Sequence, residues 1–574
     1  MIDFENPVFT ENVQLLIEGF WHKELPPLFD LSCVVSNIEN VLKNISLSKY
    51  NDQFKINSDI ISEFKSVISP SYVHKEGSEP VTFFDFKKNG SLREMQLPNL
   101  KYYVAFVYNV LSCYDNLFKK LYSEPEFAEY IDNSNSFVLF NESFRVYMGY
   151  ENAEEYVEEG LFAVNNNKTT GQLVYEKNNN HYLKKQGSHL YCAKIDIESF
   201  YPNIYTHYLS KIKDYPPFNR FQNSSAFFDF LDYYNMKINN NQTKGIVTGV
   251  FSSVVSSELL MLCVDYEIRK AIGAKVEYIR YVDDLTFFSD SLEEIKTKLA
   301  SVQQILNKYR LRINNSKTEQ LNAINNISYT NLYKLKSEFD FFNQQSGGTR
   351  ISKDIFYNIK CYISKKHSED EKAEVKAFLT LLKYSILNDN LCLESEDFYI
   401  PVYLSFYMMQ LSCLEPLYAS RCYKVIEAIL EKSKGTQNFE DIIGELQNKE
   451  EFINESYHDT ILQIWHYYVL SKYDCKFSIT QYLELIGESE ANPIILSTFI
   501  KDERKKNKDI IKYIKGVYTK TEKKDGEPDY WKSSIMNSKW WLPLFLIYLK
   551  DGSDYEKFFT SAHFNKIYKK IVNS

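Results

Sequence analysis

The sequence contains little that would place this protein outside the cell or in a membrane. Its 9 cysteines never form a Cys-x-x-Cys pair, which argues against a disulfide framework or a zinc site and favours reduced thiols. The longest apolar run, from Trp540 to Leu549, is about half the length of a membrane-spanning helix, so it predicts a buried helix. The acidic N-terminus, Met1 to Glu5, lacks the basic and then apolar pattern of an export signal. We therefore expect a cytoplasmic protein with no membrane partner.

An excess of positive charge is also absent. The chain has 67 Lys and Arg against 76 Asp and Glu, a formal net charge of −9. Because phosphate backbones bind mainly to Lys and Arg, this balance argues against a large, uniformly basic nucleic-acid surface. Any basic channel must therefore be local.

The motifs of several common enzyme classes are missing as well. There is no His-Glu-x-x-His, no Gly-x-Ser-x-Gly and no Walker phosphate loop. We expect His207 to cap or pack its helix. We expect His458 and His466 to lie eight residues apart on one helix, as surface or core residues and not as metal ligands.

What is present describes a globular chain of several parts. Its 574 residues exceed what one hydrophobic core usually organises, so two or more domains are expected. Tyr (45) and Phe (40) are abundant. Aromatic rings can stack on nucleobases, although core packing accounts for most of them.

The most informative segment runs from Val276 to Phe288 and contains two adjacent carboxylates, Asp283 and Asp284. Val, Ile, Tyr, Phe and Thr flank the two acids, which predicts two strands joined by a tight turn. Two carboxylates on one turn repel each other unless a cation neutralises them, and hard divalent ions prefer such oxygen ligands. Alone, however, an Asp-Asp pair is most often an ordinary surface turn.

A second acidic strand makes the metal interpretation more specific. In the segment Leu190 to Ile204, Asp196 ends a β-rich run and is followed by Phe200 and Tyr201. Asp196 together with the Asp283–Asp284 pair could hold two Mg²⁺ ions about 3.5–4 Å apart, with Mn²⁺ as an alternative. Such a pair of ions supports nucleotidyl transfer.

Five motifs now resemble those of the reverse transcriptases, in the order that the family has them. Asp196 to Tyr201 resembles the first palm motif, and Tyr281 to Asp284 resembles the Tyr-x-Asp-Asp motif. Between them, Gly245 to Ser253 resembles the loop before a palm helix. Leu311 to Thr318 resembles the following lysine motif, and Lys87 to Arg93 resembles the fingers motif. The chain departs from the family pattern at Val247, Thr248 and Glu94.

This resemblance implies roles for the acidic residues. Asp196 and Asp283 would ligate the two Mg²⁺ ions, Asp284 would tune or complete the site, and the carbonyl of Ile197 would add a ligand. Tyr201 stands at the family's sugar-gate position, where an aromatic ring selects dNTPs; its alternative role is palm packing.

Further roles follow for the nucleotide. Gly249 would let the backbone approach the nascent base pair, and Lys317 would assist the leaving pyrophosphate unless it is a solvated loop residue. Lys88 and Arg93 would contact the triphosphate, with Lys87 as an equal choice for Lys88; either could instead be a solvated hairpin charge.

The pattern predicts an α+β fold with two parts. Residues 1 to about 80 and 99–160 are expected to be mostly helical, and residues 81–98 to form a hairpin turning at Asn89-Gly90. Polar loops are expected at 165–171 and 178–180. The one Gly-Gly, Gly347-Gly348, predicts the boundary between a fingers-and-palm domain (1–346), an antiparallel sheet packed with helices, and a C-terminal domain (350–574).

Beyond residue 350 the periodicity becomes helical and predicts an all-α array of about ten helices, stacked in pairs. Pro416 is expected in the first turn of one helix. Another helix is expected to end at Gly487, and Asn492-Pro493 to begin the next.

With its long helical C-terminal region, the chain resembles the bacterial defence-associated reverse transcriptases, and among them the abortive-infection (AbiK-type) group. No Arg-x(4–6)-His motif occurs in the C-terminal half, which argues against the ribonuclease domain that some relatives carry. The resemblance implies a homo-oligomer that acts in antiphage defence. It also implies DNA synthesis that needs no template and starts on a hydroxyl group of the protein, so that the single-stranded DNA product would remain attached to the protein. Three alternatives stay open: a reverse transcriptase templated by a partner non-coding RNA, an RNA-synthesising polymerase, and a non-catalytic scaffold or sensor.

Overall fold

The described part of the protein comes from a computed structural model. It comprises residues 16–17, 19–28, 54–56, 68–70, 77–113, 117–118, 182–216, 218–220, 225–323, 338–342, 348–366, 369–393, 399–474, 477–502, 504–522 and 535–550. Residues 31–47, within the region that the sequence predicts to be helical, and the loops predicted for 165–171 and 178–180 lie outside these residues.

The centre of the first region is a four-stranded antiparallel sheet with the strand order β6-β7-β5-β8. Its strands are β5 (Tyr191–Asp196), β6 (Glu277–Tyr281), β7 (Asp284–Ser289) and β8 (Glu319–Asn322). Side chains alternate between the two faces, as the two-residue period of a strand requires. Ala193, Ile195 and Phe287 join the main core, whereas Cys192 and Phe288 belong to a small separate cluster on the other face. The sheet is therefore buried on both sides.

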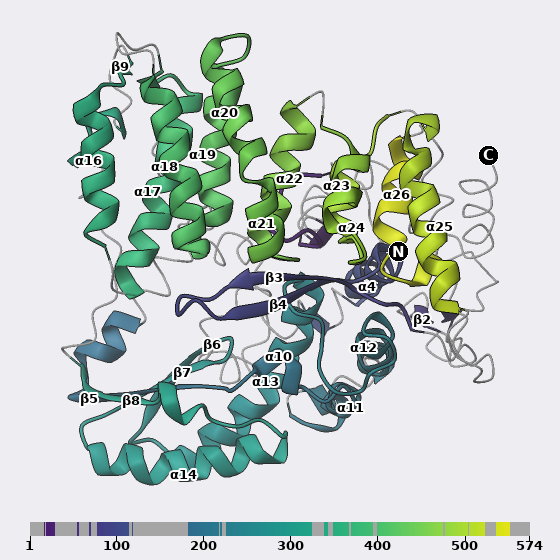
Figure 1. The fold of residues 1–574 in the computed structure, drawn as a ribbon. Coiled ribbons are helices and arrows are strands. Elements are labelled where there is room, and N and C mark those ends of the chain that lie inside the picture. Colours follow the sequence, from purple (N-terminus) through teal and green to yellow (C-terminus); the bar gives the residue numbers. More distant parts are fainter. Residues whose placement is uncertain are drawn as a thin grey trace.

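Two long helices support this sheet. In α13 (Phe251–Ile272), every residue from Phe251 to Asp265 is buried, so this helix runs through the interior. It ends at Gly273, whose φ of 72° suits glycine after a helix. Helix α14 (Leu292–Lys308) begins with Ser291, whose side chain accepts a hydrogen bond from the Glu294 N–H, and lies below the sheet (Figure 1).

Shorter helices surround α13. They are α4 (Leu100–Ser112), α10 (Phe200–Asn203), α11 (His207–Lys211) and α12 (Ser225–Ile238). His207 packs as predicted, with Nδ1 2.8 Å from Asp232 Oδ2 on α12.

A hairpin lies above the sheet. Strands β3 (Val81–Phe86) and β4 (Leu92–Leu97) pair antiparallel, and the turn contains Asn89 and Gly90, with Gly90 at a φ of 79°. This confirms the predicted hairpin and its turn.

Within residues 1–80, the helical prediction is wrong at several described places, since residues 19–28 form turns and two further segments are strands. Strands β1 (Phe54–Ile56) and β2 (Ile68–Pro70) form an antiparallel pair. Three-residue strands are too short to show a two-residue hydrophobic period, so a wider window favoured helix.

The C-terminal region is helical, as predicted, apart from a two-residue parallel pairing between β9 (Thr349–Arg350) and β10 (Leu391–Cys392). The helices from α16 to α26 are called the C-terminal helical array. They are α16 (Lys353–Ser364), α17 (Glu369–Leu387), α18 (Ile400–Leu414), α19 (Ala419–Lys432), α20 (Gln437–Asn448), α21 (Glu450–Ser456), α22 (Ile461–Tyr473), α23 (Ile479–Ile486), α24 (Pro493–Thr498), α25 (Lys508–Glu522) and α26 (Trp541–Lys550).

Several local predictions in the array are confirmed. Helix α23 ends at Gly487, and α24 begins with Asn492, whose side chain accepts from the Ile494 N–H, followed by Pro493. Pro416 starts a short 3₁₀ turn that leads directly into α19. The apolar run near the C-terminus is the buried helix α26. Among the described residues, no helix is long and apolar enough to cross a membrane.

The placement of two histidines on one helix is wrong. His458 lies in the turn between α21 and α22, and only His466 is helical, fully buried within α22. The Tyr457–Asp459 segment turns sharply there, because Asp459 adopts a φ of 56°.

The array and the first region pack against one another through the hairpin, which lies between the array and the sheet (Figure 1). The Phe84 N–H donates to the Asp459 carbonyl at 2.9 Å, and Asn492 Nδ2 donates to the Thr82 carbonyl at 3.4 Å. Residues of both regions belong to one continuous hydrophobic cluster. The division at residues 346–350 stays a prediction.

Candidate active site

The acidic turn joins β6 to β7, as the sequence predicted. Val282 and Asp283 form the turn and Asp284 begins β7. Val282 has a φ of 52°, a left-handed conformation that is unusual for a β-branched residue. The NH1 group of Arg280 donates a hydrogen bond to the Val282 carbonyl at 3.1 Å, so this side chain supports the strained turn from below.

Arg280 is itself fixed by two carboxylates of α13. Its guanidinium group is fully buried and donates to Glu258 at 2.6 and 2.8 Å and to Asp265 at 2.9–3.1 Å. Two buried opposite charges hold the pKa of Arg280 well above its usual range, although burial alone would lower it. The network therefore ties the acidic turn to the central helix.

The sheet brings the three predicted acids together. In the pairing of β5 with β7, Asp196 lies directly opposite Asp284. The Ile197 N–H donates to the Asp283 carbonyl at 3.1 Å, and Asn314 Nδ2 donates to Asp196 Oδ2 at 3.2 Å. The site therefore combines β5, the β6–β7 turn and the segment that precedes β8.

The pKa of Asp283 reflects the closeness of the other two acids. Burial, and then the neighbouring charges of Asp284 and Asp196, raise the pKa of Asp283 to about 7. Arg93 acts in the opposite direction on the same carboxyl, which places its positive charge near the acids.

A divalent ion fits the donor set of this site. Three carboxylates on adjacent strands repel one another, and carboxylate oxygens are the ligands that Mg²⁺ prefers. As the side chains stand, no group of three or more His, Cys, Asp or Glu residues in the described part of the chain is arranged to hold a metal ion. The backbone pairing nevertheless brings the three acids to one place, and their carboxylates would be the ligands of the ion.

The loop before α13 closes one side of the site. The Ile246 N–H donates to the carbonyl of Tyr201 at 3.0 Å, and the Gln96 N–H of β4 donates to the carbonyl of Thr248 at 2.9 Å. Gly249 has a φ of 103°, and a Cβ there would lie 2.5 Å from Met95 Cε. Glycine suits this position because its φ is strained for any other residue, and an added Cβ would displace the end of the Met95 side chain.

The residues predicted to bind the nucleotide lie in different parts of the fold. Arg93 is exposed on β4, opposite Asp85, and its charge reaches Asp283. Lys88 is exposed in the hairpin turn, where its carbonyl accepts from Lys372 Nζ of α17 at 2.9 Å. Tyr201 is half-buried on α10 beside the main core. The side chain of Lys317 lies outside the described residues.

Several residues of the site were missed in the sequence. Asn314 lies within the motif Leu311 to Thr318, where only Lys317 was singled out. Glu258 and Asp265 are seven residues apart on the buried part of α13, so they share a face, and two such acids required a buried cation. Arg280, only one residue before Tyr281, is that cation.

A short N-terminal segment, residues 19–28, was also missed. The Phe251 N–H donates to the carbonyl of Gly19 at 3.0 Å, and the ring of His22 lies beside Gly249. At its other end, Glu24 accepts from the Ser420 hydroxyl and from Arg421 at 3.2 Å. The segment thus joins the loop at the site to the C-terminal helical array, and no sequence pattern marks it.

The sheet, the acidic turn and the opposing Asp196 form the arrangement that the sequence predicted for a polymerase palm. Residues 141–345 match the family model described as reverse transcriptase (RNA-dependent DNA polymerase). The chain therefore contains a reverse transcriptase domain, and the hairpin and C-terminal helical array lie outside that match.

Solved telomerase structures show a much weaker similarity. Apo telomerase from Candida tropicalis is 14% identical over 75% of this chain and 72% of its own, with a TM-score of 0.27. The Candida tropicalis enzyme with a fragment of telomeric RNA is 14% identical over 72% and 65%, with a TM-score of 0.26. The Candida albicans enzyme with such a fragment is 13% identical over 85% and 66%, with a TM-score of 0.27. TM-scores this low support no inference about the chain. No curated protein matches the sequence.

Proposed function

We propose that this protein is a DNA polymerase of the reverse transcriptase family that adds dNTPs by two-metal nucleotidyl transfer. The observation that carries the proposal is the pairing of β5 with β7, which sets Asp196 opposite Asp284 and beside the turn that carries Asp283. Asp196 and the Asp283–Asp284 pair, which are far apart in the sequence, meet at one end of the sheet, where a phosphate-transfer reaction would need its metal ligands.

Asp196, Asp283 and Asp284, with the carbonyl of Ile197, would hold two Mg²⁺ ions, or Mn²⁺ in their place. When bound, the ions supply activation of a 3′-hydroxyl and screening of the leaving pyrophosphate. Asn314 orients the Asp196 carboxylate through its 3.2 Å hydrogen bond.

The chain's own residues would position the nucleotide. The positive charge of Arg93 acts on Asp283, so Arg93 would contact the triphosphate. Lys88 and Lys317 would contribute from the hairpin turn and from the segment before β8. The loop at Gly249 would face the nascent base pair, and the ring of Tyr201 would exclude a 2′-hydroxyl.

The direct test uses purified protein with labelled dNTPs and Mg²⁺, with no template added. Label that migrates with the protein on a denaturing gel until proteolysis supports synthesis that is template-independent and primed on a protein hydroxyl. Asp283→Asn should abolish labelling. Asp290→Asn is the matched control, since Asp290 directly follows β7 at the opposite end from the acidic turn.

An RNA-templated reaction is the second candidate, favoured by the description of the matched family as an RNA-dependent DNA polymerase. It predicts a partner non-coding RNA that co-purifies with the protein, and products of defined sequence that disappear after ribonuclease treatment. Equal labelling by Asp283→Asn and wild type would reject the assignment of Asp283, and no labelling of either protein, with or without RNA, would reject both polymerase candidates and leave a non-catalytic scaffold or sensor.

The biological role rests on the resemblance to abortive-infection reverse transcriptases. We place the protein in the cytoplasm as a homo-oligomer that acts in antiphage defence, with single-stranded DNA as its product. Phage should form fewer plaques on cells that express the wild type than on cells that express Asp283→Asn at the same protein level. Light scattering of the purified protein gives the subunit number, and a monomer would contradict the oligomer.

A further inference from the structure

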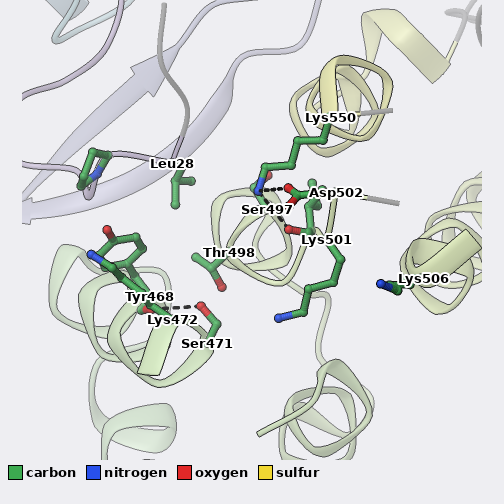
Figure 2. A pocket seen from close by; sticks show the side chains of 12 residues that line it. Leu28, Tyr468, Ser471, Lys472, Ser497, Thr498, Lys501, Asp502, Lys506 and Lys550 are labelled. Carbon is green, nitrogen blue, oxygen red and sulfur yellow. Dashed lines mark hydrogen bonds and ion pairs between the residues drawn. The ribbon is translucent and has the colours of Figure 1, made fainter. Parts of the chain in front are cut away.

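A basic pocket lies within the C-terminal helical array, apart from the acids of the palm. It has a volume of about 470 Å³ and is enclosed by α22, α24, the 3₁₀ turn Arg504–Asn507 and the end of α26, with Leu28 of the N-terminal segment at one side (Figure 2). This volume is within the range of pockets that bind a nucleotide-sized molecule.

The charged side chains that line it are four lysines, Lys472, Lys501, Lys506 and Lys550, and one carboxylate, Asp502. The lining therefore carries more positive than negative charge, whereas the whole chain has a net charge of −9. Lys472 pairs with Glu427 at 2.6 Å, and Lys550 lies 3.9 Å from Asp502.

Lys501 differs from these two lysines. Its side chain is exposed and points into the pocket in Figure 2, and no ion pair joins it to any residue in the described part of the chain. Its backbone is nevertheless held, because the N–H and the carbonyl both bond to the Asn507 side chain, at 2.8 and 2.9 Å. The amino group is therefore presented from a fixed backbone.

The hydroxyl groups of the pocket complement the lysines. Ser471, Ser497 and Thr498 each donate their hydroxyl hydrogen to a carbonyl of their own helix, at 3.0, 2.7 and 2.7 Å. Their oxygens remain as acceptors on the pocket side. The lining thus offers lysine donors for phosphate, acceptors for base or sugar groups, and apolar contact from Leu28.

We propose that this pocket binds the phosphate backbone of a single-stranded nucleic acid. The four lysines stand apart around the pocket and come from separate elements (Figure 2), so they match charges repeated along a strand better than one compact anion. The assignment of this strand to the enzyme's own DNA product rests on the proposed function; the binding itself does not.

The test is photo-crosslinking of a thiothymidine-containing oligo-dT to the full-length protein in metal-free buffer, followed by peptide mapping. Crosslinks are expected on the peptides that carry Tyr468–Lys472 and Ser497–Lys501. Lys501→Glu combined with Lys506→Glu should reduce these crosslinks at least tenfold. The double variant Lys365→Glu and Lys512→Glu makes the same change in net charge on exposed positions outside the pocket and should leave them unchanged.

Two further measurements separate the explanations. Asp283→Asn should retain the pocket crosslinks, so loss of polymerase activity and loss of pocket binding can be told apart. The proposal would be overturned if the double variant Lys501→Glu and Lys506→Glu crosslinked as well as the wild type. It would also be overturned if the wild type gave no crosslinks on the two peptides. Displacement of the oligonucleotide by dTTP at an equal concentration of phosphate would overturn the assignment to a strand and indicate a site for free nucleotide.

Discussion

At the scale of single residues, Arg280 decides where the acidic turn lies. It is fully buried, it contacts Glu258 and Asp265, and it holds the carbonyl of Val282 in a conformation that valine rarely adopts. A buried ion pair contributes little net stability, because its charges lose their contact with water. Removing one partner is costly, however, since it leaves the remaining charges buried and unpaired. Its main effect is therefore to fix the geometry of the turn.

Replacing Arg280 by Met should destabilise the protein strongly, by about 3–5 kcal/mol, because two buried carboxylates lose their cation. Urea unfolding followed by circular dichroism measures the change. The control is Lys308→Met, which removes an exposed pair with Glu267 at 2.7 Å and should cost about 1 kcal/mol or less. Equal effects of the two variants would contradict the structural role of Arg280.

His466 gives a prediction about pH. Burial lowers the pKa of His466 to about 3, whereas histidine in an unfolded chain titrates near 6.5. As the pH falls below about 6.5, the unfolded state takes up a proton that the folded state does not, so the free energy of unfolding falls. This contribution is fully present above pH 6.5 and amounts to a loss of about 2 kcal/mol at pH 5.

Replacing His466 by Gln should remove this loss. Urea unfolding at pH 7 and pH 5 is expected to show a smaller decrease for the variant than for the wild type, whatever its stability at pH 7. His458→Gln is the control, since His458 is exposed at the end of a turn. Identical pH dependence of His466→Gln and wild type would show that His466 is protonated in the folded state.

At the scale of elements, the loop before α13 is held between three parts of the chain. Its carbonyl at Thr248 pairs with β4, its start bonds to α10, and its end bonds to the N-terminal segment at Gly19. Within that segment, burial alone would raise the pKa of Glu24, but the positive charges of Arg421, Lys376 and Lys424 hold it well below its usual range. The carboxylate therefore anchors the segment to the array.

Gly249→Ala should lower dNTP incorporation at least tenfold. Alanine at this position would have to keep a φ of 103°, which strains any residue with a Cβ, and its methyl group would displace Met95 Cε (2.5 Å) and crowd His22 Cδ2 (2.9 Å). The matched control is Gly487→Ala, which also has a positive φ, 58°, but open space around the new atom. It should cost about 1 kcal/mol of stability with unchanged incorporation. Full activity in Gly249→Ala would show that the loop does not position the reaction.

At the scale of the whole molecule, the two predicted regions share one interior. The ring of Phe20 packs edge-on against Trp541 of α26 at 6.1 Å, and Trp465 Nε1 donates to the Glu24 carbonyl at 2.6 Å. The Glu79 N–H donates to the Asn537 carbonyl at 2.7 Å. We therefore expect the array and the sheet to unfold together.

Trp541→Ala tests this expectation. Loss of a fully buried indole should cost about 3–5 kcal/mol, and hydrogen exchange should accelerate in β5–β7 as well as in α22 and α26. The control is Tyr403→Ala on α18, where the side chain is 47% exposed. This variant should change neither the stability nor the rate of hydrogen exchange. Faster exchange confined to the array would mean that the two regions unfold independently, as the predicted division at residues 346–350 implies.

Local chemistry made much of this protein predictable from its sequence. The hairpin at Asn89-Gly90, the caps at Asn492 and Gly487, and the strand–turn–strand around Asp283 follow from turn residues, capping side chains and β-branched neighbours, which act over a few residues. The β1–β2 pair was missed because three-residue strands carry no readable period.

The sequence by itself determined on which strands and turn the three acids lie, because β-branched neighbours and turn residues reveal such elements over a few positions. Only the tertiary structure decided how they are held. Glu258 and Asp265 looked like misplaced charges until the fold brought Arg280 between them, and residues 19–28 carry no motif at all. Pairing of this kind depends on which surfaces meet in three dimensions, and the sequence separates the partners by 15 residues in the case of Arg280 and Asp265 and by 397 in the case of Glu24 and Arg421.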